Sequence, residues 1–224
     1  VELNTLGASE YTLVGLVVDC SGSVASFARE EEAAIKEVVR ACRESPRADS
    51  LMLRLSRFDH NVVEVHGFKL LQDCQPNDYD RTIPAGGSTA LFDASIDGIE
   101  AVARFGRELG ANDYTANAIV FVITDGENNT GLYQSAGAVR AAVQKALQSE
   151  NLESIVTVLI GVNDASLSSY LTSFAKDAGF TEYVSIGNAD ARTLARLAAF
   201  VSKSISSQSQ ALGSGGPSQQ LPTF

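Results

Sequence analysis

The sequence lacks tryptophan altogether and contains few cysteines. Its 224 residues include no Trp and only three Cys, which are Cys20, Cys42 and Cys74. An odd and sparse set of thiols does not form the framework of a small secreted disulfide scaffold. We therefore expect reduced, buried cysteines, which favour a cytoplasmic location. Because the chain starts at Val1 rather than a methionine, a removed leader and an extracellular location stay open.

Long hydrophobic runs and clusters of basic residues are missing as well. The longest apolar stretches, such as residues 155–162, fall well short of the ~20 residues that cross a bilayer, so we expect no membrane span. The formal net charge is −10, and no basic run occurs anywhere. Since binding of nucleic-acid phosphates needs clustered Lys and Arg, nucleic acid is not an expected partner.

Short β-branched runs alternate with longer segments of helical period along most of the chain. This alternation predicts an α/β fold with a doubly wound, mostly parallel six-stranded sheet and helices on both faces, similar to a Rossmann fold. A hairpin around Asp59-His60-Asn61 supplies one antiparallel edge strand. The predicted strands are residues 12–18, 51–58, 62–68, 118–124, 155–162 and 183–186, and the predicted helices are residues 27–43, 91–109, 134–148, 167–178 and 191–205.

The composition changes after residue 205. Residues 206–224 are rich in Ser, Gln and Gly and contain two prolines, which predicts a flexible tail or linker behind a domain of residues 1–205. The final Leu-Pro-Thr-Phe is a candidate docking peptide.

Three polar clusters stand where predicted strands give way to helices. The first strand ends in Asp19-Cys20-Ser21-Gly22-Ser23, and the central strand ends in Asp125-Gly126. The loop before the second long helix reads Gly-Gly-Ser-Thr and ends at Thr89. Ligands of such sheets bind beyond the carboxyl ends of the strands, so these clusters are expected to converge on one point.

The residue types in these clusters predict a metal site. Two carboxylates and three hydroxyls form an all-oxygen set, which suits a hard cation such as Mg²⁺, or alternatively Mn²⁺ or Ca²⁺. Such a set leaves a coordination position for an oxygen from outside, which an Asp or Glu of a partner protein would fill. The predicted metal ligands are Asp19, Ser21, Ser23, Thr89 and Asp125.

Each polar cluster also has a plainer explanation. Ser and Asp at a strand-to-helix turn often only satisfy free amides at the start of a helix, and Thr89 can do the same for the helix that follows it. Asp125 begins a common turn pair. The only histidines, His60 and His66, lie in the predicted hairpin, where surface positions are more ordinary than a metal or catalytic role.

Taken together, the three clusters resemble the metal-ion-dependent adhesion site of the von Willebrand factor A domain, or integrin I-type, family. The family's Asp-x-Ser-x-Ser signature matches Asp19, Ser21 and Ser23. Its distant threonine matches Thr89 in Gly-Gly-Ser-Thr-Ala-Leu, and its second aspartate matches Asp125 in Val-Ile-Thr-Asp-Gly. The resemblance implies direct coordination by the serines, and direct or water-mediated coordination by Thr89 and the aspartates.

Enzymes that use similar elements lack their own required residues here. A haloacid dehalogenase-type phosphatase needs a second carboxylate where Ser21 stands. A serine hydrolase needs a Gly-x-Ser-x-Gly elbow and a late histidine, but residues 86–90 lack the last glycine and no histidine follows His66. A phosphotyrosine-type cysteine enzyme needs arginine where Ser26 stands. Dinucleotide and Walker motifs are absent from the sequence. We therefore expect no enzyme, and a metal-dependent hydrolase is the least favoured function.

The resemblance instead implies a protein-binding module that captures an acidic residue of a partner through a Mg²⁺-type ion. We expect an intracellular adaptor or scaffold, and delivery of substrates to a separate AAA+ ATPase is one such role. An extracellular adhesion module is the alternative, which a signal peptide in the full-length gene would favour.

Overall fold

A six-stranded sheet forms the centre of the structure, a computed structural model that describes residues 3, 6–149, 151–214 and 221–224. The strand order is β3-β2-β1-β4-β5-β6, and only the β2–β3 pair is antiparallel. This confirms the predicted α/β architecture with its antiparallel edge strand. The strands are β1 (Glu10–Asp19), β2 (Leu51–Phe58), β3 (Val62–Leu70), β4 (Thr115–Thr124), β5 (Ile155–Gly161) and β6 (Glu182–Ser185).

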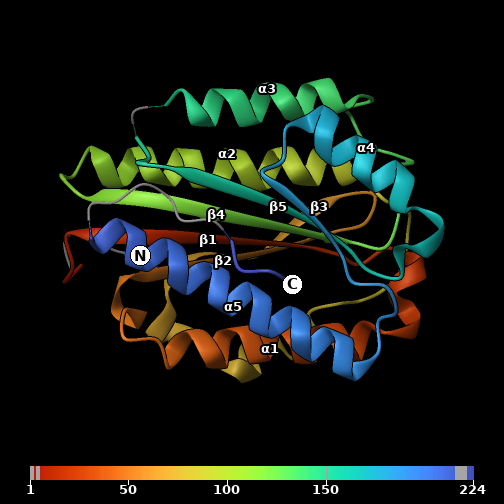
Figure 1. The fold of residues 1–224 in the computed structure, drawn as a ribbon, viewed down its shortest axis with the longest axis horizontal. Helices are drawn as coiled ribbons and strands as arrows, with labels where there is room; N and C mark the ends of the chain where they lie inside the picture. Colours follow the sequence, from red (N-terminus) through yellow and green to blue (C-terminus); the bar gives the residue numbers. More distant parts are fainter. Residues whose placement is uncertain (1–2, 4–5, 150, 215–220) are drawn as a thin grey trace.

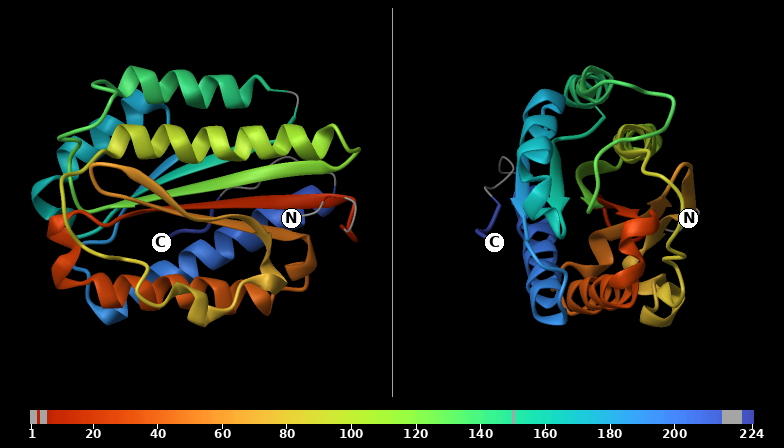
Figure 2. Two further views of the ribbon diagram at one scale, coloured as in Figure 1. Left: turned by 180° about the vertical axis from the view of Figure 1, so that it is seen from behind. Right: turned by 90° about the vertical axis from the view of Figure 1, so that its right-hand side faces the viewer.

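Helices cover both faces of the sheet. Figure 1 shows α2, α3 and α4 on one side and α1 and α5 on the other, and the views in Figure 2 agree. No helix among the described residues is long and apolar enough to cross a membrane. The helices are α1 (Ala28–Arg43), α2 (Leu91–Gly110), α3 (Ala136–Leu147), α4 (Ser168–Ala178) and α5 (Ala191–Gly213).

The central strands β1 and β4 each contain a long apolar run because both of their faces are buried. Successive side chains of a strand point to opposite faces, so Leu16 and Val18 of β1 belong to the core under α1 and α5. Leu13 and Val17 belong to the second core, which α2, α3 and α4 cover. This explains why the sequence pattern of these strands is a continuous hydrophobic run rather than an alternating one.

The strand register brings the two candidate aspartates to one edge of the sheet. In the parallel β1–β4 pair, Val18 lies opposite Ile123, so the ends of both strands are level. Asp19 is the last residue of β1, and Asp125 follows directly after β4. Because the strands are parallel neighbours, both carboxylates emerge at the same edge.

The predicted end of the last helix is wrong. Helix α5 continues to Gly213, so the first part of the predicted flexible tail, residues 206–213, is helical. Gln208 and Ser209 are buried against the domain. The side-chain amide of Asn117 donates to the backbone carbonyl of Gln208 at 2.8 Å, and Arg47 Nε donates to Ser209 Oγ at 3.0 Å. These tertiary contacts outweigh the low helix propensity of Ser. Residues 215–220, which also belong to the predicted tail, lie outside the described residues.

The final residues also lie against the domain. Leu221 and Phe224 are half-buried and pack on the core under α5. The Phe224 ring contacts the Phe200 ring edge-on at 5.8 Å, and the Arg196 guanidinium lies 4.8 Å from its centroid. The segment predicted as a docking peptide for a partner therefore packs on its own chain in this structure.

Candidate functional site

The three predicted loops meet at the carboxyl edge of the sheet. The amide of Gly22 donates to the carbonyl of Gly87 at 3.1 Å, and the amide of Gly86 donates to the carbonyl of Cys20 at 2.8 Å. These two bonds join the loop after β1 to the loop before α2. Gly87 has φ +79°, and a Cβ there would lie 2.8 Å from His60 Nδ1, so this turn requires glycine.

Four of the predicted ligands are connected by hydrogen bonds. The Ser23 hydroxyl donates to Asp125 Oδ1 at 2.7 Å, although the two residues are far apart in sequence. The hydroxyls of Ser21 and Ser23 are 3.3 Å apart, and the amide of Ser21 donates to Asp19 Oδ1 at 2.8 Å. The structure therefore brings Asp19, Ser21, Ser23 and Asp125 together, as the sequence predicts.

Thr89 lies at the same place. A Cβ on Gly126 would be 3.3 Å from the Thr89 hydroxyl oxygen, so this hydroxyl adjoins the residue that follows Asp125. Its backbone is fixed by Asn129, whose side-chain oxygen accepts from the Thr89 amide at 2.8 Å and whose own amide donates to the Thr89 carbonyl at 3.0 Å. All five predicted ligands thus lie in one region.

Helix capping does not explain the hydroxyls of Ser21 and Thr89, for which it was the plainer explanation. Ser21 precedes the short 3-10 helix Gly22–Ser26, but its side chain makes no capping bond. The start of α2 is capped instead by Asn128, whose side-chain oxygen accepts from the Phe92 amide at 3.0 Å. Thr89 does not perform this role. Capping therefore occupies neither the Ser21 hydroxyl, which lies 3.3 Å from the Ser23 hydroxyl, nor the Thr89 hydroxyl.

The two carboxylates lie in an unfavourable electrostatic environment. Asp19 is completely buried, and this burial, with a further contribution from the charge of Asp125, raises its pKa to about 6 despite hydrogen bonds from Thr124 and Ser21. Burial also raises the pKa of Asp125. Within the described part of the chain, neither carboxylate forms an ion pair with Lys, Arg or His. A divalent cation between them would supply the missing positive charge.

Thr124 is a site residue that the sequence analysis missed. Its hydroxyl donates to Asp19 Oδ2 at 2.6 Å and accepts from the Gly126 amide at 3.1 Å. It is 1% exposed, so it fixes the carboxylate of Asp19 from within the sheet. Its position in the sequence, as the last residue of a predicted strand and directly before Asp125, could have identified it as a site residue.

The donor set fits a hard divalent cation. Only oxygen atoms are offered by the five predicted ligands, and Mg²⁺, Mn²⁺ and Ca²⁺ prefer oxygen ligands. No group of three or more His, Cys, Asp and Glu with metal-binding geometry occurs among the described residues. His66 is engaged elsewhere, with its ring nitrogens 2.8 Å from the Gly67 carbonyl and 3.1 Å from the Tyr79 hydroxyl.

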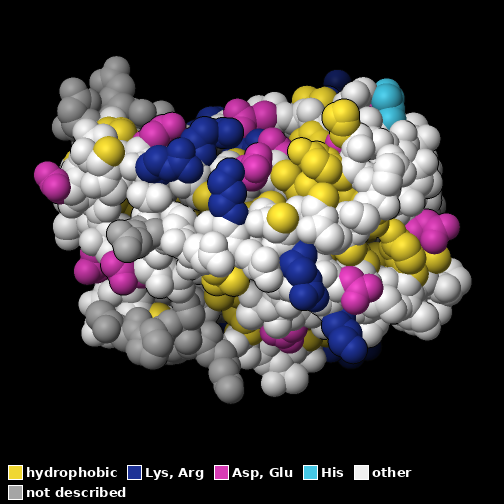
Figure 3. All heavy atoms as spheres, turned by 90° about the horizontal axis from the view of Figure 1, so that it is seen from above, with side chains coloured by type: hydrophobic (Ala, Val, Ile, Leu, Met, Phe, Trp, Pro, Cys, Tyr) yellow, Lys and Arg dark blue, Asp and Glu magenta, His cyan; other side chains and the backbone are white. Residues whose placement is uncertain are grey.

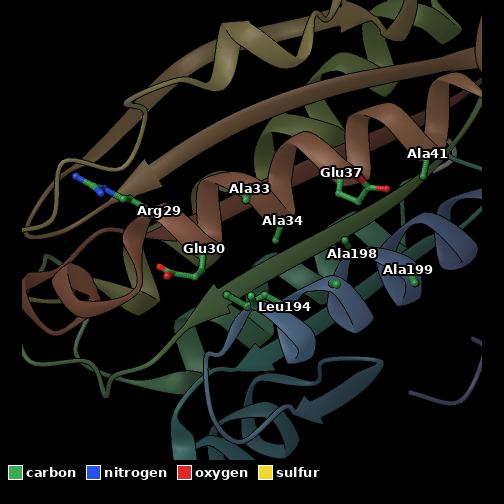
Figure 4. A pocket seen from close by; sticks show the side chains of 11 residues that line it. Arg29, Glu30, Ala33, Ala34, Glu37, Ala41, Leu194, Ala198 and Ala199 are labelled. Carbon is green, nitrogen blue, oxygen red and sulfur yellow. The ribbon is translucent and has the colours of Figure 1, made fainter.

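A separate groove of about 580 Å³ runs between α1 and α5. Figure 4 shows small side chains such as Ala33, Ala34 and Ala198 along it, with Glu30 and Arg29 near one end. None of the predicted metal ligands lines this groove. It is therefore distinct from the oxygen-lined region at the sheet edge.

The fold is a Rossmann-like domain with a cluster of hydroxyls and carboxylates at the strand ends. The sequence matches the von Willebrand factor type A domain family over residues 14–199. The chain belongs to this family, which confirms the predicted resemblance. Domains of the family are in general metal-dependent modules for protein interaction. No curated protein matches the sequence.

Several solved structures share the fold at low sequence identity. The PilB minor pilin from Streptococcus sanguinis superposes with a TM-score of 0.65 at 14% identity over 94% of this chain and 64% of the pilin. The pilus adhesin SpaC from Lactobacillus rhamnosus GG gives 0.63 at 13% identity over 88% of this chain and 31% of SpaC. Proximal thread matrix protein 1 from the mussel byssus, solved with a zinc-occupied MIDAS motif, gives 0.59 at 20% identity over 88% of this chain and 46% of that protein. The chain spans less than two thirds of the length of each.

Proposed function

We propose that this domain binds one Mg²⁺-type cation through Asp19, Ser21, Ser23, Thr89 and Asp125 and uses it to capture an acidic residue of a partner protein. The main support is the bond from Ser23 to Asp125, which links the loops after β1 and β4 into one oxygen-lined site. Neutral hydroxyls make up most of the donor set, so the ion keeps an affinity for a further carboxylate. The partner's Asp or Glu would complete its coordination.

The environment of the cysteine beside the site does not favour thiol catalysis. Cys20 is the nearest candidate nucleophile in sequence, but burial and the charges of Asp59 and Asp19 raise its pKa to about 12. A thiol with so high a pKa stays protonated and is a poor nucleophile. This argues against a thiol nucleophile at Cys20.

The surface near this end of the molecule suits a protein partner. Leu132 and Tyr133 follow the loop after Asp125 and are exposed, with 76% and 42% of their surface accessible. Asp93 of α2 accepts hydrogen bonds from both of their amides, which holds the pair in a defined place. Seen from the side of α3, hydrophobic side chains are more frequent toward the right-hand half of the molecule, the end at which β1 and β4 finish (Figure 3). Ordered apolar side chains of this kind are typical contacts at the centre of an interface.

For the cellular role, we propose an adaptor or scaffold in a reducing compartment, with an AAA+ ATPase as one candidate partner. The thiols of Cys20, Cys42 and Cys74 are all free and buried, which supports this location. An extracellular adhesion module is the competing role.

The binding step is tested by calorimetric titration of Mg²⁺ into the metal-free domain. Wild type should bind one equivalent, whereas Asp19→Ala and Asp125→Ala should give no binding heat. Asp177→Ala is the matched control, because this aspartate is exposed on α4 and should leave binding unchanged. Equal heats for wild type and Asp19→Ala would refute the assigned ligands.

The capture step is tested with the domain immobilised in Mg²⁺ buffer and exposed to lysate. A specifically retained protein should be released by EDTA, and also by excess glutamate but not by chloride at the same ionic strength. Retention that survives both EDTA and glutamate would contradict capture of an acidic residue through the ion.

A further inference from the structure

Glu31 is a carboxylate buried inside the domain without an evident structural partner. It lies in the first turn of α1, soon after the Asp19 loop, and is only 2% exposed. Its Oε2 atom has no hydrogen-bond partner among the described residues. A buried acid without a compensating partner destabilises a fold, so such a residue needs an explanation.

The charges that face Glu31 are all negative. Burial raises its pKa well above 4.5, and the carboxylates of Asp19, Asp125 and Glu32 raise it further, in that order. The two largest charge effects therefore come from the proposed cation ligands. Glu32, by contrast, has a structural role, because its Oε1 accepts from the Ile83 amide at 3.0 Å.

We propose that Glu31 is a positioning residue of the cation site, a third carboxylate that stabilises the ion from behind the Asp19 loop. This inference rests on the proposed function. Glu31, Asp19 and Asp125 do not form a cluster with the spacing of shared metal ligands, as far as the described residues show. Glu31 therefore acts on the ion without coordinating it, through its negative charge and through an unpaired oxygen that can accept a hydrogen bond from a bound water.

This assignment explains why an acid is kept at this buried position. Without a cation, the carboxylate only adds to the repulsion among Asp19, Asp125 and Glu32. With a cation at the sheet edge, the same negative charge becomes favourable. Residues that surround metal ligands commonly change metal affinity by about 10–100-fold when they are replaced.

The test compares Glu31→Gln with Glu30→Gln in the full chain, using Mg²⁺ alone as the probe. Both changes replace an acid by an amide of the same shape, but Glu30 lines the α1–α5 groove, which none of the proposed ligands lines. Mg²⁺ affinity is measured by calorimetry, and the Tm is measured in EDTA. Glu31→Gln should weaken Mg²⁺ binding about 10-fold or more and leave the metal-free Tm unchanged or higher. Glu30→Gln should match wild type in affinity.

The two readouts separate this role from a structural one. A lower metal-free Tm together with weaker binding would assign Glu31 to the core and overturn the inference, as would an affinity for Glu31→Gln that equals that of wild type. If wild type binds Mg²⁺ and Asp19→Ala does not, an unchanged affinity in Glu31→Gln would overturn only the role of Glu31. If wild type itself fails to bind, the proposed function and this inference both fail.

Discussion

Replacement of Gly98 by alanine should disturb the contact between α2 and the sheet. Gly98 is buried in the middle of α2, where the helix lies directly on β1 and β4 (Figure 1). A Cβ at this position would be 2.6 Å from Val17 Cγ2 and 3.3 Å from Val120 Cγ1. Real Cβ atoms do not approach neighbours so closely, so α2 must move outward or Val17 must shift.

The expected magnitude is the difference between two opposing effects. Alanine is favoured over glycine inside a helix by about 1 kcal/mol. Overpacking of a well-filled core costs about 1–3 kcal/mol. Gly98→Ala should therefore change the free energy of unfolding by between about zero and a loss of 2 kcal/mol. Since α2 begins just after Thr89, an outward movement should also weaken Mg²⁺ binding.

Urea denaturation at constant m-value measures this change, and Gly110→Ala is the matched control. Gly110 ends the same helix, and a Cβ added there would have no atom within 4 Å. The control should gain the same helix-propensity term of about 1 kcal/mol without any overpacking, so the two variants should differ by the overpacking cost of about 1–3 kcal/mol. The Val17→Ala change should be less harmful in the Gly98→Ala background than in wild type. Equal stabilities for the two glycine variants would refute the close contact.

Three further predictions concern separate parts of the molecule. Thr124→Val keeps the shape but removes the hydroxyl that positions Asp19, so calorimetry should show Mg²⁺ binding weaker by about 10-fold or more. Burial lowers the pKa of His66 below 6.5, so the folded protein binds this proton less readily than the unfolded chain. The contribution of neutral His66 to the free energy of unfolding is therefore complete above the ordinary pKa of 6.5 and is lost as the pH falls below it. Denaturation between about pH 7 and pH 5 should show that His66→Gln loses less of its free energy of unfolding on acidification than wild type does. Phe224→Ala removes the ring packed on α5 and should lower the free energy of unfolding by about 1 kcal/mol, whereas exposed Thr223→Ala should not.

Each of these predictions has a clear opposing outcome. Unchanged Mg²⁺ affinity in Thr124→Val would show that Asp19 needs no support from this hydroxyl. Parallel stability curves for wild type and His66→Gln would contradict the burial argument for His66. Equal losses in Phe224→Ala and Thr223→Ala would remove the specific role of the Phe224 ring.

The sequence was sufficient for the centre of the sheet because β1, β4 and β5 are buried on both faces and contain long apolar runs. The edge strand β3 is only partly buried and was predicted from the turn that precedes it. The sequence was also sufficient for the convergence of Asp19, Ser21, Ser23, Thr89 and Asp125 because the carboxyl ends of parallel neighbouring strands share an edge. Both predictions depend on local pattern and on general rules of topology.

The remaining features depend on contacts between distant residues, which local pattern does not reveal. The last turns of α5 are rich in Ser and Gln, and bonds from the distant residues Asn117 and Arg47 hold them against the domain. The hydroxyl of Thr124 reads as an ordinary strand residue until its bond to Asp19 is seen. Glu31 likewise reads as one of three adjacent acids on a helix, and only its burial distinguishes it.

The most direct test of the cation site is a crystal of this domain soaked with Mn²⁺ and measured for anomalous scattering. We expect a single strong peak at the carboxyl edge of the sheet, bordered by the loops that carry Asp19, Ser23, Thr89 and Asp125. No peak at that edge, or manganese bound only elsewhere on the domain, would contradict the proposed site.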